Sequence, residues 1–122
     1  MITSIKFVSV PTHDQGRALT FWTQKFGFTV ASDQPFDDSP RWIELRIPGA
    51  DTRLVLFPAQ APSARPDDVT NIAFMADDVE RTYAELKAKG VEFAGPVEKT
   101  DWGSSAVFQD SEGNRFVISS KS

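Results

Sequence analysis

Two stretches of this 122-residue chain decide its fold: residues 14–28, DQGRALTFWTQKFGF, and residues 78–93, DVERTYAELKAKGVEF, which are two copies of one pattern. Each begins with an aspartate, carries apolar residues at helical spacing and reaches a glycine before a short strand-like run. Aspartate suits a helix N-cap, and glycine ends a helix in the left-handed conformation. The pattern therefore predicts two related helices, over residues 14–26 and 78–89.

The segments around the two helices repeat in the same order. Residues 7–10 and residues 71–74 each have the character of a strand and stand 64 positions apart. After each helix come three more strand-like runs, and the last two are joined by turn-rich residues. The runs lie at residues 28–30, 42–47, 53–57, 91–93, 106–109 and 115–119. The sequence therefore predicts a βαβββ unit used twice.

A polar, proline-bearing connector separates the two copies. We expect one domain over residues 1–122, made of a first unit (1–58), a connector (59–69) and a second unit (70–122). A unit of about 55 residues buries too little surface to be stable alone. The two copies are therefore expected to share one core, within a chain or between chains.

Composition excludes several classes of function. Seventeen acids against 13 bases give a net charge of −4, which disfavours nucleic acid and anionic membranes as partners. The chain has no cysteine and one histidine, so disulfides, thiolate nucleophiles and zinc–cysteine sites are excluded. No apolar run approaches the roughly 20 residues of a membrane span, and no secretion signal is evident. We expect a cytoplasmic protein.

Further short motifs accompany the repeat. They are Arg17-Ala18-Leu19, Phe21-Trp22, Phe26-Gly27-Phe28, Trp102-Gly103 and Asp110-Ser111-Glu112-Gly113-Asn114. In this order and spacing the chain resembles the vicinal oxygen chelate superfamily, which includes glyoxalase I, bleomycin-resistance proteins and extradiol dioxygenases. The resemblance implies an α+β fold in which two βαβββ repeats form a glyoxalase-like split barrel around a cavity. It also implies a homodimer.

The resemblance further implies where a metal would bind. Family members that use a metal place one ligand on the first and one on the last strand of each unit, which corresponds to Phe7, Val55, Asn71 and Val117 here. Three of these side chains are apolar, and an asparagine alone does not hold a divalent ion against water. A shift by one residue supplies no ligand set either. We expect no metal and no cofactor.

His13 lies outside the predicted strands, just before the first helix. A lone histidine without clustered partners makes no three-ligand site, so we expect a solvent-facing loop residue. A role as a general base stays open.

Strand alternation predicts two different sheet faces. One face is nearly all apolar and suits packing beneath the helices; it comprises Val8, Val10, Ile43, Leu45, Ile47, Leu54, Leu56, Ile72, Phe74, Val107, Phe116 and Ile118. The other mixes aromatic and isolated polar residues, which is typical of small-molecule sites, although a solvated outer face is the alternative. From it we predict a ligand site of Phe7, Ser9, Trp42, Glu44, Arg46, Val55, Phe57, Asn71, Ala73, Phe108 and Val117, with Trp102 at the rim or in a dimer interface.

Glu44 is the candidate acid–base group of that face. Desolvation among aromatic rings would raise the pKa of its carboxyl group, whereas the alternative is an ion pair with Arg46 or Arg53. The leading hypothesis is a metal-free protein that binds an aromatic or cationic small molecule in a cavity between paired units. The alternatives are an enzyme of the glyoxalase or dioxygenase type, metal-dependent or using Glu44, and an interaction dimer without a ligand.

Overall fold

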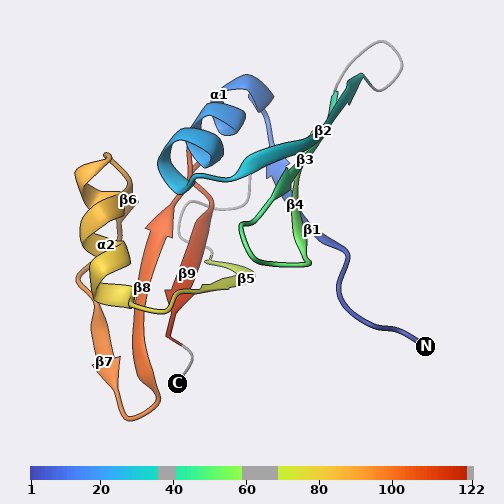
Figure 1. The fold of residues 1–122 in the computed structure, drawn as a ribbon. Helices are drawn as coiled ribbons and strands as arrows, with labels where there is room; N and C mark the ends of the chain where they lie inside the picture. The colour runs from blue at the N-terminus through green and yellow to red at the C-terminus, as the bar shows by residue number, and fades with distance from the viewer. Residues whose placement is uncertain (36–40, 59–68, 121–122) are drawn as a thin grey trace. The chain divides into compact units, whose positions relative to one another are not determined.

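The computed structural model describes residues 1–35, 41–58 and 69–120. Its contacts divide the chain into two compact units, Met1–Ser63 and Ala64–Ser122 (Figure 1). The connector predicted at residues 59–69 lies outside the described residues except for Val69, where the first strand of the second unit begins. Every helix in the described part of the chain is too short or too polar to span a membrane.

The first unit has the predicted βαβββ order. It contains β1 (Phe7–Thr12), α1 (Gln15–Thr20), the π-helical turn η1 (Phe21–Lys25), β2 (Thr29–Pro35), β3 (Arg41–Arg46) and β4 (Arg53–Pro58). The sheet order is β1-β4-β3-β2, with β1 parallel to β4 and the other pairs antiparallel (Figure 1).

The predicted first helix is confirmed, but it is not α-helical throughout. Asp14 caps it, accepting a hydrogen bond from the Arg17 backbone nitrogen at 3.0 Å, and Gly27 follows its end with φ of 73°. The last turn widens into η1, where Trp22 is fully buried and its ring stacks on Phe28 at 5.7 Å. Hydrophobic periodicity distinguishes a π-turn from an α-turn poorly, because the two differ by a single residue.

The core of the first unit lies on one face of its sheet. Ile43, Leu45, Leu54 and Leu56 are completely buried on that face. Helix α1 contacts β4, and its Ala18 is buried as well. In each unit, we call the face of the sheet opposite the helix of that same unit the helix-free face. The apolar-face prediction is confirmed for these four residues.

The second unit repeats this plan with one strand interrupted. It contains β5 (Val69–Met75), α2 (Val79–Ala88), β6 (Glu92–Phe93), β7 (Glu98–Thr100), β8 (Gly103–Gln109) and β9 (Arg115–Ser119). The order is β5-β9-β8-β6, and β7 also pairs with β8 (Figure 1). Asp78 caps α2 through the Arg81 backbone nitrogen, as predicted. Two short strands therefore replace the single second strand of the first unit, with Gly95 and Pro96 between them; proline cannot donate to a ladder.

The predicted face of β8 is wrong by one residue. Phe108 pairs with Phe116 and is fully buried, whereas Val107 pairs with Val117 on the helix-free face. The Phe108 and Phe116 rings stack at 5.4 Å within the core, and Phe74 contacts both. The strand begins at Gly103, earlier than predicted, and a shift of one residue exchanges every side chain between the two faces.

A carboxylate holds the β8–β9 hairpin together. Asp110 Oδ1 accepts hydrogen bonds from the backbone nitrogens of Glu112 and Asn114, both at 2.9 Å. Asp110 Oδ2 accepts from Asn114 Nδ2 at 3.1 Å. Both Asp110 and Asn114 are buried, and Gly113 has φ of 86°. These hydrogen bonds therefore hold the turn in one conformation. Burial raises the pKa of the Asp110 carboxyl group above its ordinary 3.8.

Candidate functional site

Seven residues of the predicted ligand site share one sheet face in the first unit, together with Arg53. The register sets Phe7 beside Arg53, Ser9 beside Val55, Glu44 beside Val55, and Arg46 beside Arg53. Partners directly opposite in a sheet point to the same side. The helix-free face of this sheet thus carries Phe7, Ser9, Trp42, Glu44, Arg46, Arg53, Val55 and Phe57.

Three aromatic rings form a continuous surface there. Trp42 meets Phe7 edge to face at a centroid distance of 5.6 Å and Phe57 at 6.2 Å, with interplanar angles of 85° and 88°. Phe7 and Phe57 remain 37% and 39% exposed. We call these three residues, with Glu44, Arg53 and Val55, the aromatic face. Its exposed rings offer flat apolar contact area to a partner molecule.

Glu44 links the rings to the charged part of this face. Trp42 donates from Nε1 to Glu44 Oε1 at 3.1 Å, and Arg53 donates from Nη1 to Glu44 Oε2 at 2.6 Å. Glu44 itself is 8% exposed. A buried carboxylate that is hydrogen-bonded on both oxygens fixes its neighbours in place. The indole ring of Trp42 is accordingly held in one orientation.

Of the two alternatives predicted for Glu44, a raised pKa and an ion pair with an arginine, the structure supports the ion pair. The hydrogen bond from Arg53 has the largest effect and holds the pKa of Glu44 below its ordinary 4.5, and the bond from Trp42 acts in the same direction. Desolvation opposes them, with an effect smaller than that of the Arg53 bond but larger than that of the Trp42 bond. Glu44 is therefore ionised at neutral pH and paired, which is the ion-pair alternative, with Arg53 as the partner.

The remaining predicted residues of the first unit take different places. Val55 is fully buried, and Ser9 is exposed. Arg46 donates from Nη1 to the Val30 carbonyl oxygen at 3.1 Å, so its side chain turns toward β2. His13 is exposed between β1 and α1.

The second unit brings fewer of the predicted residues together. Ala73 and Val117 are register partners on its helix-free face. Phe108, by contrast, belongs to the core, as described above. Trp102 stands 86% exposed at the tip of the β7–β8 hairpin. The side chain of Asn71 lies outside the described part of the structure.

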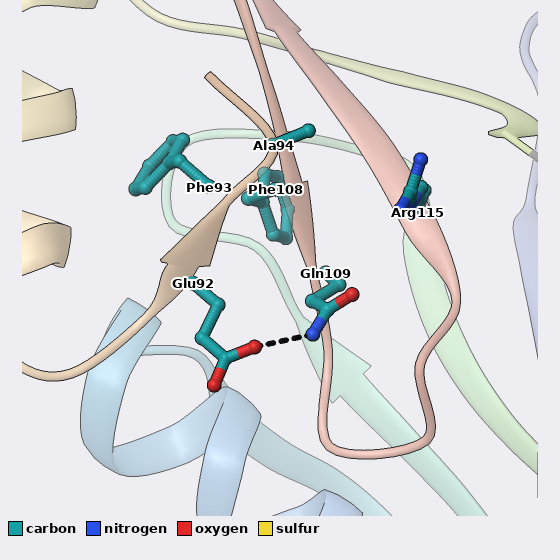
Figure 2. A pocket seen from close by; sticks show the side chains of 6 residues that line it. All are labelled: Glu92, Phe93, Ala94, Phe108, Gln109 and Arg115. Atoms are coloured by element: carbon teal, nitrogen blue, oxygen red, sulfur yellow. Dashed lines mark hydrogen bonds between the residues drawn. The ribbon is translucent and has the colours of Figure 1, made fainter. Parts of the chain in front are cut away.

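The structure adds a small pocket, and of its lining residues the predicted ligand site includes Phe108 alone. The pocket has a volume of about 130 Å³ and is lined by Glu92, Phe93, Ala94, Phe108, Gln109 and Arg115 (Figure 2). Gln109 Nε2 donates to Glu92 Oε2, and Arg115 comes from the neighbouring strand β9. A second hollow of about 160 Å³ adjoins residues 94–96, where β6 gives way to β7. Both depend on the interrupted strand, which periodicity alone did not reveal.

The four positions that the resemblance assigns to metal ligands differ in environment. Phe7 and Val55 are diagonal neighbours on one sheet, and Val117 adjoins Ala73 on the other. The aromatic ring of Phe7 and the aliphatic side chains of Val55 and Val117 carry no donor atom. Across residues 1–35, 41–58 and 69–120, no three His, Cys, Asp or Glu side chains gather closely enough to hold an ion.

Paired βαβββ units of this kind define a class of protein, and comparison with known proteins identifies it. Residues 4–118 match the model of the Glyoxalase/Bleomycin resistance protein/Dioxygenase superfamily, so the chain belongs to this superfamily. The predicted glyoxalase-like α+β fold is thereby confirmed.

Individual relatives cover almost the whole chain. It is 37% identical to the uncharacterized protein YetH of Bacillus subtilis (strain 168), over 97% of this chain and 98% of that one. Among solved structures, it resembles TnmS3, an antibiotic binding protein from Streptomyces sp. CB03234, with 33% identity, a TM-score of 0.84 and coverage of 99% and 98%. A superfamily member from Sphaerobacter thermophilus DSM 20745 shows 28% identity, a TM-score of 0.86 and coverage of 98% of both chains.

Proposed function

We propose that this protein binds a small planar aromatic compound on the aromatic face, without a metal ion. The observation that carries the proposal is the continuous surface of Phe7, Trp42 and Phe57, in which Trp42 is oriented by a buried carboxylate. Stacking on fixed rings costs little side-chain entropy, because the rings are already ordered before binding. The likeness to TnmS3, described as an antibiotic binding protein, supports the same class of function.

An acid–base mechanism through Glu44 has less support. A general acid or base works best with a pKa near the operating pH, and Arg53 moves the pKa of Glu44 in the opposite direction. Binding therefore accounts for the arrangement of this face better than proton transfer does. The metal-dependent alternative would need donor atoms that Phe7 and Val55 do not have.

Calorimetric titration with a neutral polycyclic probe, anthraquinone made soluble by a short glycol chain, tests the proposal. We expect Trp42→Ala to weaken binding by about tenfold or more, because a stacked ring contributes about 1–3 kcal/mol. The control is Trp102→Ala, which removes the exposed indole at the hairpin tip of the second unit and should leave the affinity within about twofold.

Equal loss of affinity in both variants, or binding that only Trp102→Ala abolishes, would place the site elsewhere. Metal content is measured on the same samples. Binding that disappears on dialysis against a chelator and returns with a divalent ion would contradict the metal-free part of the proposal.

A further inference from the structure

The charges around the aromatic face have the opposite sign from the charge of the whole chain. The chain carries a net −4, which by itself favours cationic ligands. On the helix-free face of the first sheet, however, the described residues contribute one carboxylate, Glu44, and two guanidinium groups, Arg46 and Arg53. Lys6 is close enough to help hold down the pKa of Glu44. Over contact distances the nearby charges outweigh distant ones, because salt screens beyond about 10 Å.

Glu44 has little capacity left for a ligand. Its two oxygens already accept from Trp42 and Arg53, and its side chain is 11% exposed. A cation bound to Glu44 would have to displace Arg53 or share a buried carboxylate with it, and like charges in close contact repel. The negative group on this face therefore stabilises the protein and is poorly placed to receive a cationic ligand.

Arg53 is in the reverse situation. Its side chain is 40% exposed, and it stands directly beside Phe7 in the register, at the border of the aromatic surface. Within the described part of the chain, its guanidinium donates to Glu44 through Nη1. A guanidinium carries further N–H donors in a planar fork, and the Glu44 carboxylate holds this fork in position. Donors fixed next to an apolar ring suit a carbonyl, phenolate or carboxylate attached to an aromatic ring.

We propose that the aromatic face selects planar aromatic compounds that carry a hydrogen-bond acceptor or a negative charge, with Arg53 as the residue that determines this preference, and discriminates against cations of the same shape. The inference rests on the proposed function, since it concerns the ligand of the same face. It reverses the preference that the net charge predicts.

Three probes with one ring system separate charge from shape: 2-naphthoate, 2-acetylnaphthalene and 2-(aminomethyl)naphthalene, titrated calorimetrically at pH 7. We expect the anion to bind tightest, the neutral ketone next, and the cation about tenfold or more weaker than the anion. The difference between anion and cation should shrink at high salt. A cation that binds as tightly as the anion overturns the inference and leaves the proposed function intact.

Two variants assign the preference to named residues. Glu44→Gln removes the counter-charge of Arg53, so it should tighten the binding of the anion by about fivefold and weaken the binding of the cation. The double variant Glu44→Gln/Arg53→Gln keeps the net charge and should remove most of the preference between anion and cation, leaving what Arg46 and Lys6 supply. The matched control is Glu85→Gln/Arg81→Gln, which removes an exposed ion pair of the same residue types on α2 and should leave the preference unchanged.

The outcomes distinguish the two proposals. If the double variant keeps the anion preference, Arg53 does not set it and the inference fails. Circular dichroism checks that Glu44→Gln keeps the fold. If this variant then binds both charged probes more weakly by the same factor, the carboxylate acts only by orienting Trp42, and the charge argument fails. If none of the three probes binds the unchanged protein, the proposed function fails together with the inference.

Discussion

The two units carry their sheet aromatics on opposite faces. In the first unit Phe7, Trp42 and Phe57 lie on the helix-free face, while the face under the helix is aliphatic. In the second unit Phe74, Phe108 and Phe116 lie in the core, and the helix-free face has small residues such as Ala73 and Val117. One duplicated backbone plan thus places aromatic rings in the core of one copy and on the helix-free face of the other.

The physical reason is the period of two along a strand. A ring moved by one position changes from a buried packing element to an exposed contact surface, with no change in the backbone plan. The two sheets have a similar aromatic content, but their rings lie on different faces. The differences between the units are open to measurement.

The largest expected effect is on the stability of the second core. Phe108→Ala should lower the free energy of unfolding by about 3–5 kcal/mol, because it removes a fully buried ring stacked on Phe116. The matched change in the first unit, Phe57→Ala, should cost about 1 kcal/mol or less, since that ring is 39% exposed. Urea unfolding of both variants measures the contrast, and equal losses would contradict it.

The two β-hairpins before the last strands should differ next. Asp110→Ala removes the acceptor for two backbone nitrogens and the Asn114 amide, and should cost about 2 kcal/mol. Asp51→Ala, at an exposed position in the corresponding hairpin of the first unit, should stay within about 0.5 kcal/mol. Thermal unfolding compares the stability losses of the two variants. A loss of the same size from Asp51→Ala would mean that an aspartate stabilises both hairpins.

The helix caps should behave alike, which tests the similarity of the units. Asp14→Ala and Asp78→Ala should each cost about 1 kcal/mol, because each removes an acceptor for a backbone nitrogen in the first turn. Asp77→Ala, exposed and adjacent to the second cap, is the control and should be nearly neutral. Urea unfolding measures both losses of stability. A marked difference between the two cap variants would show that η1 changes the stability of the first helix.

The smallest effects concern pH, and they have opposite signs in the two units. The lowered pKa of Glu44 contributes stability above its unfolded-state pKa, and this stability is lost as pH falls through the folded-state pKa. The raised pKa of Asp110 acts in reverse: its contribution is present below the unfolded-state pKa and is lost as pH rises through the folded-state value.

Unfolding free energies between about pH 3 and pH 7 measure both contributions. Compared with the unchanged protein, Glu44→Gln should lose less stability on acidification, whereas Asp110→Asn should lose more over the same range. Carboxyl carbon titrations by NMR give the two pKa values directly. A pKa of Glu44 above 4.5, or of Asp110 below 3.8, would reverse the sign for that residue.

Much of this fold was predictable because its signals are local. The aspartate caps, the glycine after each helix and the repeated order of elements depend on residues close together in the sequence, and the structure confirms them. The face shared by Phe7, Trp42 and Val55 was also predicted, since three strands of alternating character agreed on it.

The parts that sequence analysis missed depend on register. The phase of β8 follows from its pairing with β9: residues 110–114 separate the paired Gln109 and Arg115, one residue fewer than residues 47–52 between the paired Arg46 and Arg53. The choice of Arg53 over Arg46 as the partner of Glu44 likewise required the cross-strand geometry. Arg46 instead reaches the Val30 carbonyl oxygen.

By itself, then, the amino-acid sequence determined that this protein consists of two related βαβββ units with aromatic and polar residues on one face of the first sheet. Capping, helix ending and alternation are properties of neighbouring residues, so they can be read from the chain. Only the tertiary structure decided that the Phe108 side chain lies in the core and that Arg53 is the ion-pair partner of Glu44. Both depend on which residues stand opposite one another across strands, and hydrogen-bond pairing between distant segments sets that register.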